Sequence, residues 1–289
     1  MKIKNDFNDL KPVIWKSKVG NITFVFPFFK QRIKIFQAAN ADHAVFLKST
    51  LNHPDLSGYF HPILWTLGRY VFSGWVKGIS CETLSNEQKY LVIDWIVTVQ
   101  TRFHQIALCK HDEEAGLNYL DYLEKRLIRF APPETDLEKI QKLRVIASSS
   151  PVTISSLSHP DMTLRNIVLE ESSGNYKIID NELLTQSPFF LLDIYNTCYS
   201  LGPNPELIHH YLDRYSSCQK GFDLQPGWAS SLAAAWSLRL AGSHFQAGRY
   251  QKGAEVLEHW DAGNQEIVEM IVNTQTHPNQ AYISSKIIK

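Results

Sequence analysis

The stretch LSHPDMTLRNIVL at residues 157–169 and the stretch YKIIDNE at residues 176–182 decide how the rest of the chain is interpreted. They contain two short β-branched runs, 166–170 and 176–180, on either side of the turn-forming residues SSGN at 172–175. This pattern predicts a β-hairpin. Three oxygen-bearing side chains mark this hairpin. Asp161 precedes it, Asn166 stands at its start and Asp180 at its end.

These three side chains are of the types that phosphoryl transfer from a nucleotide needs. That reaction demands little covalent chemistry from a protein and much positioning, with a carboxylate that orients the acceptor hydroxyl. It also demands magnesium, which prefers hard oxygen ligands. Asp161 would supply the first group. Asn166 and Asp180 would supply the second, because a hairpin brings its two ends together.

The chain before this region predicts a small antiparallel sheet interrupted by one helix. Residues 12–36 form extended runs separated by a turn, and the last run alternates so that Arg32 and Lys34 share one face. A helix is predicted over 41–51 with Asn40 as its N-cap. Two more extended runs follow near residues 61–67 and 69–73, and residues 74–78 form a connector.

After residue 78 the pattern becomes mainly helical. Helices are predicted over 87–108, 117–130 and 137–147, and helical segments continue from about residue 189 to 272. No internal repeat and no low-complexity tract interrupts them. The sequence therefore predicts three parts: a small nucleotide-binding lobe with its connector at 1–78, a larger helical lobe at 79–275, and a tail at 276–289.

The motif and the order of elements resemble the eukaryotic-like kinase superfamily, specifically its branch of aminoglycoside, choline and homoserine kinase-like phosphotransferases. That branch shows H-G-D-x-x-x-x-N, a short hairpin, I-D-[WF]-[ED], and then a proline and a further aspartate. The resemblance covers about residues 12 to 260. The matching positions in this chain are His159, Pro160, Asp161, Asn166, Ile179, Asp180, Asn181, Glu182, Pro188 and Asp193.

The resemblance implies an α+β, protein-kinase-like two-lobed fold, with a small antiparallel-sheet N-terminal lobe and a larger mainly helical C-terminal lobe. It also implies an ATP- and Mg²⁺-dependent phosphotransferase that acts on a hydroxyl of a small molecule. Asp161 would be the catalytic base, Asn166 and Asp180 the metal ligands, and Lys34 the residue that holds the α- and β-phosphates, with Lys30 as its fallback. The run from Phe72 through Gly74 to Val76 would be the hinge beside the adenine. Asp193 would be structural.

The sequence departs from the family pattern at several places, among them Leu164 and Arg165, which replace the usual Pro-Gly, and a phosphate-covering turn with Gly20 as its only nearby glycine. Pro160 replaces the usual glycine of the loop and lacks a backbone N–H. The glutamate expected early in the small-lobe helix is missing, since residues 41–48 contain only Asp42, and the partner of Lys34 is therefore left open. These departures motivate an alternative from another class, a pseudokinase or nucleotide-binding scaffold without turnover. A protein kinase fits less well, because Thr163 stands where that class has a lysine.

Composition limits the partners. Lys+Arg and Asp+Glu are both 29, so the net charge is +0 and no bulk field favours nucleic acid or an anionic membrane. The four cysteines, at positions 81, 109, 198 and 218, are too widely spaced for a zinc cluster or a dense disulfide framework. Neither a signal peptide nor an apolar run of about 18 residues is present. A soluble, cytoplasmic protein is expected, and its oligomeric state stays open.

The acceptor is constrained only loosely. The segment 204–260 is the candidate wall of the acceptor site, and it mixes aromatic residues with similar numbers of acidic and basic ones. A polycation would need concentrated carboxylates there. We therefore expect a small, neutral or singly charged hydroxyl compound with an apolar portion, whose identity stays open. Glu182 is either a metal or acceptor contact or a helix-start carboxylate. Trp228, Trp236 and Trp260 are expected to pack in the core.

Overall fold

The computed structural model describes residues 13–16, 22–28, 31–107, 109–110, 113–149, 154–202, 204–218 and 227–260. These residues fall into two compact units. The first comprises the described parts of Met1–Leu84 and Leu164–Thr185, and the second those of Ser85–Thr163 and Gln186–Lys289. The predicted lobes, 1–78 and 79–275, stay a prediction, and the contacts group residues 164–185 with the first unit. The predicted tail lies outside the described residues.

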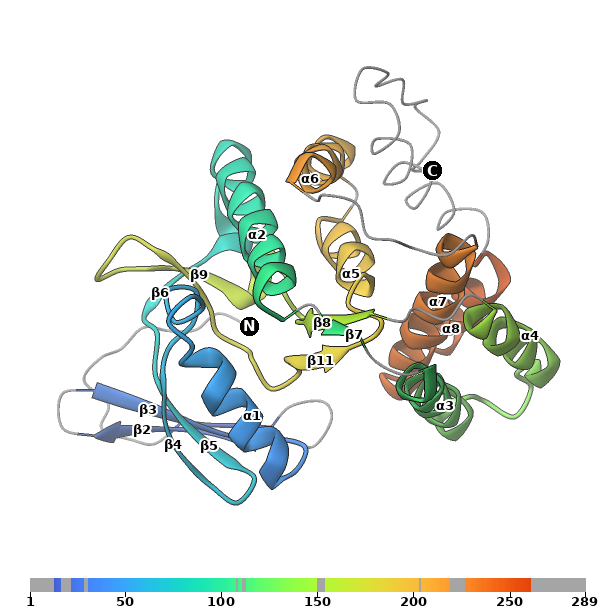
Figure 1. The fold of residues 1–289 in the computed structure, drawn as a ribbon, viewed down its shortest axis with the longest axis horizontal. Coiled ribbons are helices and arrows are strands. Elements are labelled where there is room, and N and C mark those ends of the chain that lie inside the picture. The colour runs from blue at the N-terminus through green and yellow to red at the C-terminus, as the bar shows by residue number, and fades with distance from the viewer. Residues whose placement is uncertain are drawn as a thin grey trace. The chain divides into compact units, whose positions relative to one another are not determined.

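The first unit contains a five-stranded antiparallel sheet with the order β1-β2-β3-β5-β4. The extended runs predicted for this region are confirmed. Helix α1, at Ala41–Leu51, lies against β4 and β5 (Figure 1). The strands are β1 (Val13–Lys16), β2 (Ile22–Phe28), β3 (Gln31–Gln37), β4 (Ile63–Leu67) and β5 (Tyr70–Gly74).

Helix α1 begins and packs as its sequence predicts. The side chain of Asn40 accepts a hydrogen bond from the His43 N–H at 2.7 Å, which satisfies one of the unpaired donors of the first turn. Ala44, Leu47 and Leu51 recur at helical spacing and are completely buried. Their burial against the sheet holds the helix in place.

The first unit also contains a second, three-stranded antiparallel sheet with the order β10-β9-β6. Its strands are β6 (Gly78–Ser80), β9 (Ile167–Glu170) and β10 (Tyr176–Ile178). The hairpin β9–β10 was predicted, and β6 was not. A side chain at Gly78 would collide with the backbone carbonyl of Leu169, so only glycine allows β6 to approach β9 this closely.

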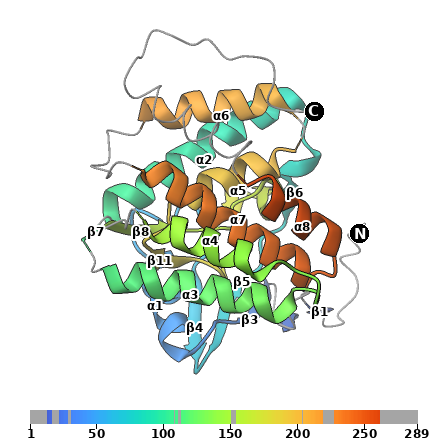
Figure 2. The ribbon, with the colours of Figure 1, turned by 90° about the vertical axis from the view of Figure 1, so that its right-hand side faces the viewer.

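The second unit is mainly helical and is organised around α7 (Trp228–Gln246), which packs against α3, α4 and α8 (Figure 2). Helices α7 and α3 lie close together at Gly242, where a Cβ would stand 3.5 Å from the Cα of Leu127, an ordinary van der Waals contact. The other helices are α2 (Asn86–Ala107), α3 (Glu113–Phe130), α4 (Leu137–Ser148), α5 (Leu192–Ser200), α6 (Pro205–Cys218) and α8 (Tyr250–Glu258). The helical prediction is confirmed for the described helices up to Glu258, the last residue of α8.

A three-stranded sheet in the second unit was not predicted. Its strands are β7 (Cys109–Lys110), β8 (Ile154–Ser158) and β11 (Thr185–Ser187), in the order β11-β8-β7. The side chain of Trp236 on α7 is buried and packs on Tyr195 with ring centroids 5.4 Å apart, as core packing predicts. In the described part of the chain, no helix combines the length and the hydropathy needed to cross a membrane.

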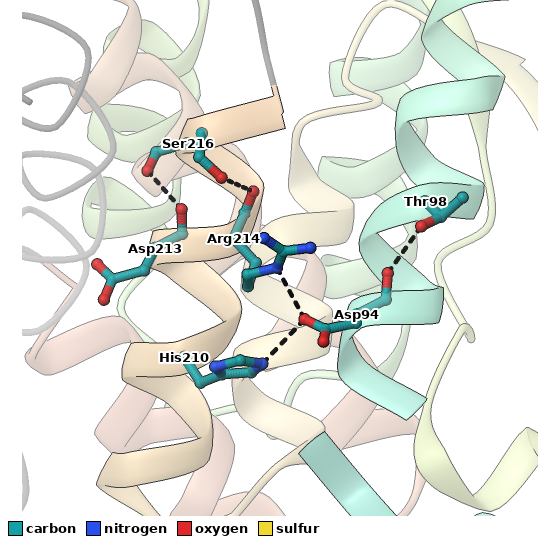
Figure 3. A network of polar contacts seen from close by, with 7 residues as sticks. Asp94, Thr98, His210, Asp213, Arg214 and Ser216 are labelled. Atoms are coloured by element: carbon teal, nitrogen blue, oxygen red, sulfur yellow. Dashed lines mark hydrogen bonds and ion pairs between the residues drawn. The ribbon is translucent and has the colours of Figure 1, made fainter. Parts of the chain in front are cut away.

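A polar network joins α2 to α6 (Figure 3). One carboxylate oxygen of Asp94 accepts from His210 Nε2 at 2.9 Å and from Arg214 Nε at 2.8 Å. The ring of Tyr90 meets the His210 imidazole edge to face, with centroids 4.9 Å apart. Because the three polar side chains are partly exposed, solvent screens the attraction and limits its contribution.

We expect Asp94→Ala to lower the free energy of unfolding by about 1 kcal/mol, because two partners on another helix lose the same acceptor. Urea denaturation measures this change. Asp213→Ala is the matched control, since among the described residues the carboxylate of Asp213 pairs with His209 alone, one turn away on the same helix. An equal loss in the two variants would show that the network does not fasten α2 to α6.

Candidate active site

The loop that carries Asp161 is held by hydrogen bonds to a buried carboxylate. Asp193, in the first turn of α5, accepts from Ser158 Oγ at 2.8 Å and from the backbone N–H of His159 at 2.7 Å. Burial raises the pKa of Asp193 to about 7. The two hydrogen bonds and the charge of Arg239 oppose this rise but do not cancel it. The side chain therefore acts as a structural support for the loop.

Asp161 itself lies in a turn at the partly exposed end of this loop. The N–H of Met162 donates to the His159 carbonyl at 3.0 Å, and the N–H of Thr163 donates to the Asp161 carbonyl at 2.9 Å. Pro160 has no N–H to donate, and these backbone bonds form without one. The departure at position 160 is thus compatible with an ordered loop.

The hairpin places Asn166 and Asp180 at its base, within the first unit. The Ile179 N–H donates to the Asn166 carbonyl at 3.0 Å, so the residue before Asp180 pairs directly with Asn166. Strand pairing continues the same register, with Ile178 opposite Ile167 and Tyr176 opposite Leu169. The structure therefore brings these two predicted metal ligands to the same end of one hairpin.

Lys34 on β3 reaches the same end of the hairpin. Its ammonium donates to the Ile179 carbonyl at 2.8 Å and lies 3.7 Å from Asp180 Oδ1. The lysine side chain is 14% exposed and the aspartate 40%. The acidic partner of Lys34, which the sequence left open, is Asp180. The fallback, Lys30, lies outside the described residues.

His43 on α1 is a residue of this region that the sequence did not reveal. Its Nδ1 accepts from the Ala39 N–H at 3.2 Å, so Nε2 is the protonated nitrogen and donates to the Leu184 carbonyl at 2.8 Å. The Leu184 N–H in turn donates to the Asn181 carbonyl at 3.2 Å. Helix α1 is thus tied to the turn that follows Asp180 by a neutral imidazole, where a glutamate was expected.

The predicted hinge residues run along the end of β5 and just beyond it. Phe72 stacks on Trp65 with ring centroids 4.8 Å apart, and Val76 is buried. A side chain at Gly74 would clash with the His61 imidazole, since its Cβ would lie 2.8 Å from Cε1. The His61 Nδ1 atom is buried and has no partner among the described residues. The hinge role of the three residues stays a prediction.

The residues around Asp180 fit a magnesium ion held mainly by oxygen atoms of a nucleotide. Asn166 and Asp180 offer an amide and a carboxylate oxygen, which are hard donors. Within the described ranges, no three His, Cys, Asp or Glu side chains converge as they would in a metal centre built from protein alone. Magnesium tolerates such a sparse set, because it keeps several waters and binds through one or two carboxylates and substrate phosphates.

No family model and no curated protein matches this sequence. Solved structures do match. Choline kinase LicA from Streptococcus pneumoniae is 14% identical with a TM-score of 0.58, covering 86% of this chain and 94% of that one. The ethanolamine kinase of Plasmodium vivax is 14% identical with a TM-score of 0.52, covering 92% and 82%. Aminoglycoside phosphotransferase APH(4)-Ia is 11% identical with a TM-score of 0.61, covering 91% and 94%.

The chain has the kinase-like fold of these small-molecule phosphotransferases. This confirms the predicted fold class and the resemblance on which it rested. Identities this low carry the fold alone, so the roles of Asp161, Asn166, Asp180 and Lys34 are not transferred by the comparison. Lys34, Asn166 and Asp180 are described together in the first unit, and Asp161 is described in the second.

The raised pKa of Asp193 predicts a pH-dependent stability. An exposed aspartate has a pKa of about 4, so between pH 4 and about 7 the folded state binds a proton that the unfolded chain has lost. We expect the unfolding free energy of the wild type, relative to Asp193→Asn, to fall by a few kcal/mol over this range and to level off above it, since one pKa unit corresponds to about 1.4 kcal/mol. Urea titrations at a series of pH values measure the difference.

Asp121→Asn is the control of opposite sign. A hydrogen bond from Arg144 lowers the pKa of Asp121, so its contribution is present above the unfolded pKa and is lost as the pH falls. A wild-type curve parallel to that of Asp193→Asn would show that Asp193 stays ionised throughout.

Proposed function

We propose that this protein is an ATP- and Mg²⁺-dependent phosphotransferase that moves the γ-phosphate of ATP to a hydroxyl group of a small molecule. The observation that carries the proposal is the placement of the Lys34 ammonium against Ile179 and Asp180 at the end of the hairpin. A half-buried cation and a carboxylate in contact are suited to a nucleotide phosphate and its metal ion. The shared fold supports the same reaction class.

Each proposed role follows from the charge of the side chain and its position. Lys34 would bind the α- and β-phosphates, and Asp180 and Asn166 would hold magnesium through their side-chain oxygens. The bound metal ion would neutralise charge on the phosphate oxygens during transfer. Phe72, Gly74 and Val76 would line the adenine. The partly exposed Asp180 carboxylate can meet both the ammonium and a metal ion.

Asp161 would orient the acceptor. Its carboxylate would accept the proton of the acceptor hydroxyl as the oxygen attacks the γ-phosphorus, and the bond to the β–γ bridging oxygen would break to leave ADP. Asp193 would hold the backbone of the loop during this step through Ser158 and His159. The cytoplasm would supply ATP and magnesium, and it suits the free, buried thiols of Cys81 and Cys198.

The alternative is a protein that binds nucleotide without turnover. The missing helix glutamate motivates it, and the contact of Lys34 with Asp180 argues against it because that contact supplies the carboxylate in another way. Binding of ATP with magnesium, together with no release of ADP over a broad set of hydroxyl compounds, would favour this scaffold function.

We expect Asp161→Asn to lower kcat by about 10²–10⁴-fold, because the amide cannot accept the hydroxyl proton. The affinity for Mg·ATP should change little, since Asp161 is not a proposed ligand of the nucleotide. A coupled assay of ADP release measures the first quantity and isothermal titration calorimetry the second. Full turnover in the variant would remove Asp161 from the mechanism.

We expect Lys34→Met to weaken Mg·ATP binding by about 10–100-fold, because hydrogen bonds from a charged donor contribute about 1.5–3 kcal/mol. Lys177→Met is the matched control. The ammonium of Lys177 also donates to a backbone carbonyl of the first unit, that of Gly58 at 2.7 Å, but no predicted site residue is its partner. Equal losses of affinity in the two variants would contradict the phosphate-binding role.

A further inference from the structure

Gln100 is a buried amide on α2, at a position where helical periodicity predicts an apolar side chain. It is 2% exposed, and its helix neighbours Ile96 and Phe103 belong to the core. Burying an amide is costly unless both its oxygen and its nitrogen are bonded. Here Oε1 accepts from the Tyr211 hydroxyl of α6 at 2.8 Å, and Nε2 donates to Thr197 Oγ1 of α5 at 3.2 Å. One side chain thus connects three helices.

Tyr211, Gln100 and Thr197 form a directed chain of hydrogen bonds that ends on the backbone of Asp193. Burial raises the pKa of Tyr211, so its hydroxyl keeps its proton and donates to Gln100. The Thr197 hydroxyl accepts from Gln100 and donates to the Asp193 carbonyl at 2.8 Å. Donors and acceptors aligned in one direction polarise each other, which strengthens each bond of the chain.

The first turn of α5 needs such a support. Its N-cap residue is Leu191, whose side chain has no atom that accepts a hydrogen bond. The carboxylate of Asp193 projects from this same turn and accepts from Ser158 Oγ and the His159 N–H. The bond from Thr197 to the Asp193 carbonyl therefore acts on the backbone that carries the carboxylate.

Helix α2 also holds the other side of this contact. Ser156 on β8 is completely buried, and its Oγ donates to the Phe103 carbonyl at 3.2 Å. Phe103 follows Gln100 by three residues on the same helix. One stretch of α2 therefore bonds both to β8, which leads into the loop of Asp161, and to α5, which carries Asp193. The hydrogen bonds close a circuit within the second unit.

We propose that Gln100 is a positioning residue of the phosphotransfer reaction, which fixes Asp193 and, through it, the backbone that presents Asp161 to the acceptor. This inference rests on the proposed function. A reacting group misplaced by about 1 Å can lower a rate by about 10²-fold. An apolar side chain at position 100 would fill the same space, but it would take one partner away from each of Thr197 and Tyr211 and release the turn that holds Asp193.

The first test measures turnover in variants of the chain. Thr197→Val removes the hydroxyl with little change of shape, and Gln100→Met removes both polar atoms of the amide. We expect each change to lower kcat by about 10–100-fold. KM for Mg·ATP should stay unchanged, since neither residue is a proposed ligand of the nucleotide. Thr197→Ser retains the hydroxyl and should retain most of the activity. Wild-type kcat in both Thr197→Val and Gln100→Met would overturn the inference.

Thr98→Val is the matched control. The hydroxyl of Thr98 donates to the Asp94 carbonyl at 2.9 Å, four residues earlier on α2, as that of Thr197 does on α5. Its loss should leave kcat unchanged, and a decrease as large as that in Thr197→Val would contradict the proposed role. The double variant Gln100→Met/Thr197→Val should be no slower than the slower single variant, because both changes break one chain. Additive losses would contradict the chain.

Hydrogen exchange separates this inference from the proposed function, because it needs no substrate. The amide of His159 should exchange about tenfold faster or more in Gln100→Met and Tyr211→Phe, while the amides of α3 and α4 keep their wild-type rates. Tyr211→Phe removes a single hydroxyl and provides the test if Gln100→Met does not fold.

An unchanged rate at His159, or an equal acceleration throughout the second unit, would overturn the inference whether or not ADP is released. Faster exchange at His159 alone, together with no ADP release by the wild type from any hydroxyl compound, would overturn the phosphotransferase proposal and leave the hydrogen-bond chain standing.

Discussion

The buried carboxylate of Asp193 is the constraint on which the path of the loop before Asp161 depends. A carboxylate in the interior needs donors for its oxygens, and the loop after β8 supplies them through Ser158 and the His159 backbone. The same bonds fix the path of the chain just before Asp161. Helix α5 is therefore a support that orients a loop it does not itself form, and a change in how α5 packs would be transmitted to Asp161.

In the first unit, two separate contacts hold the segment around Asp180. Lys34 approaches from β3, and His43 approaches from α1 through the Leu184 carbonyl. A single carboxylate on helix α1 could pair with Lys34 and so connect both the helix and the strand to this region through one ion pair. Here the charge partner of the lysine comes from the hairpin, and the helix contributes a neutral hydrogen bond. The glutamate that the resemblance predicts on the helix is absent, yet helix α1, strand β3 and the hairpin are still connected.

The sequence predicted the elements that local patterns determine, and it missed the strands and contacts that depend on residues far apart in the chain. Helix α1 with its Asn40 cap and the hairpin 167–178 follow from side-chain periodicity and turn residues, and both are confirmed. Strand β8 was missed because its sequence, ISSLS, is rich in serine and lacks the β-branched pattern of a strand. Its serines are buried because they form hydrogen bonds with Phe103, Gln186 and Asp193. The partner of Lys34 was missed because Asp180 is far away in sequence, and His43 because its bond to a backbone carbonyl leaves no signature of paired charges.

The pairing of β6 with β9 has a consequence for how the protein is made. Residues 164–185 complete the first unit. During synthesis they emerge from the ribosome only after helices α2, α3 and α4, which lie between them and the earlier part of the unit. The first unit therefore cannot complete its fold until β9 is synthesised, and until then the edge of β6 that pairs with β9 stays unpaired. For the same reason, neither unit corresponds to a continuous fragment. Dividing the chain at any single point from residue 84 to residue 185 would split at least one of the two units between different polypeptides.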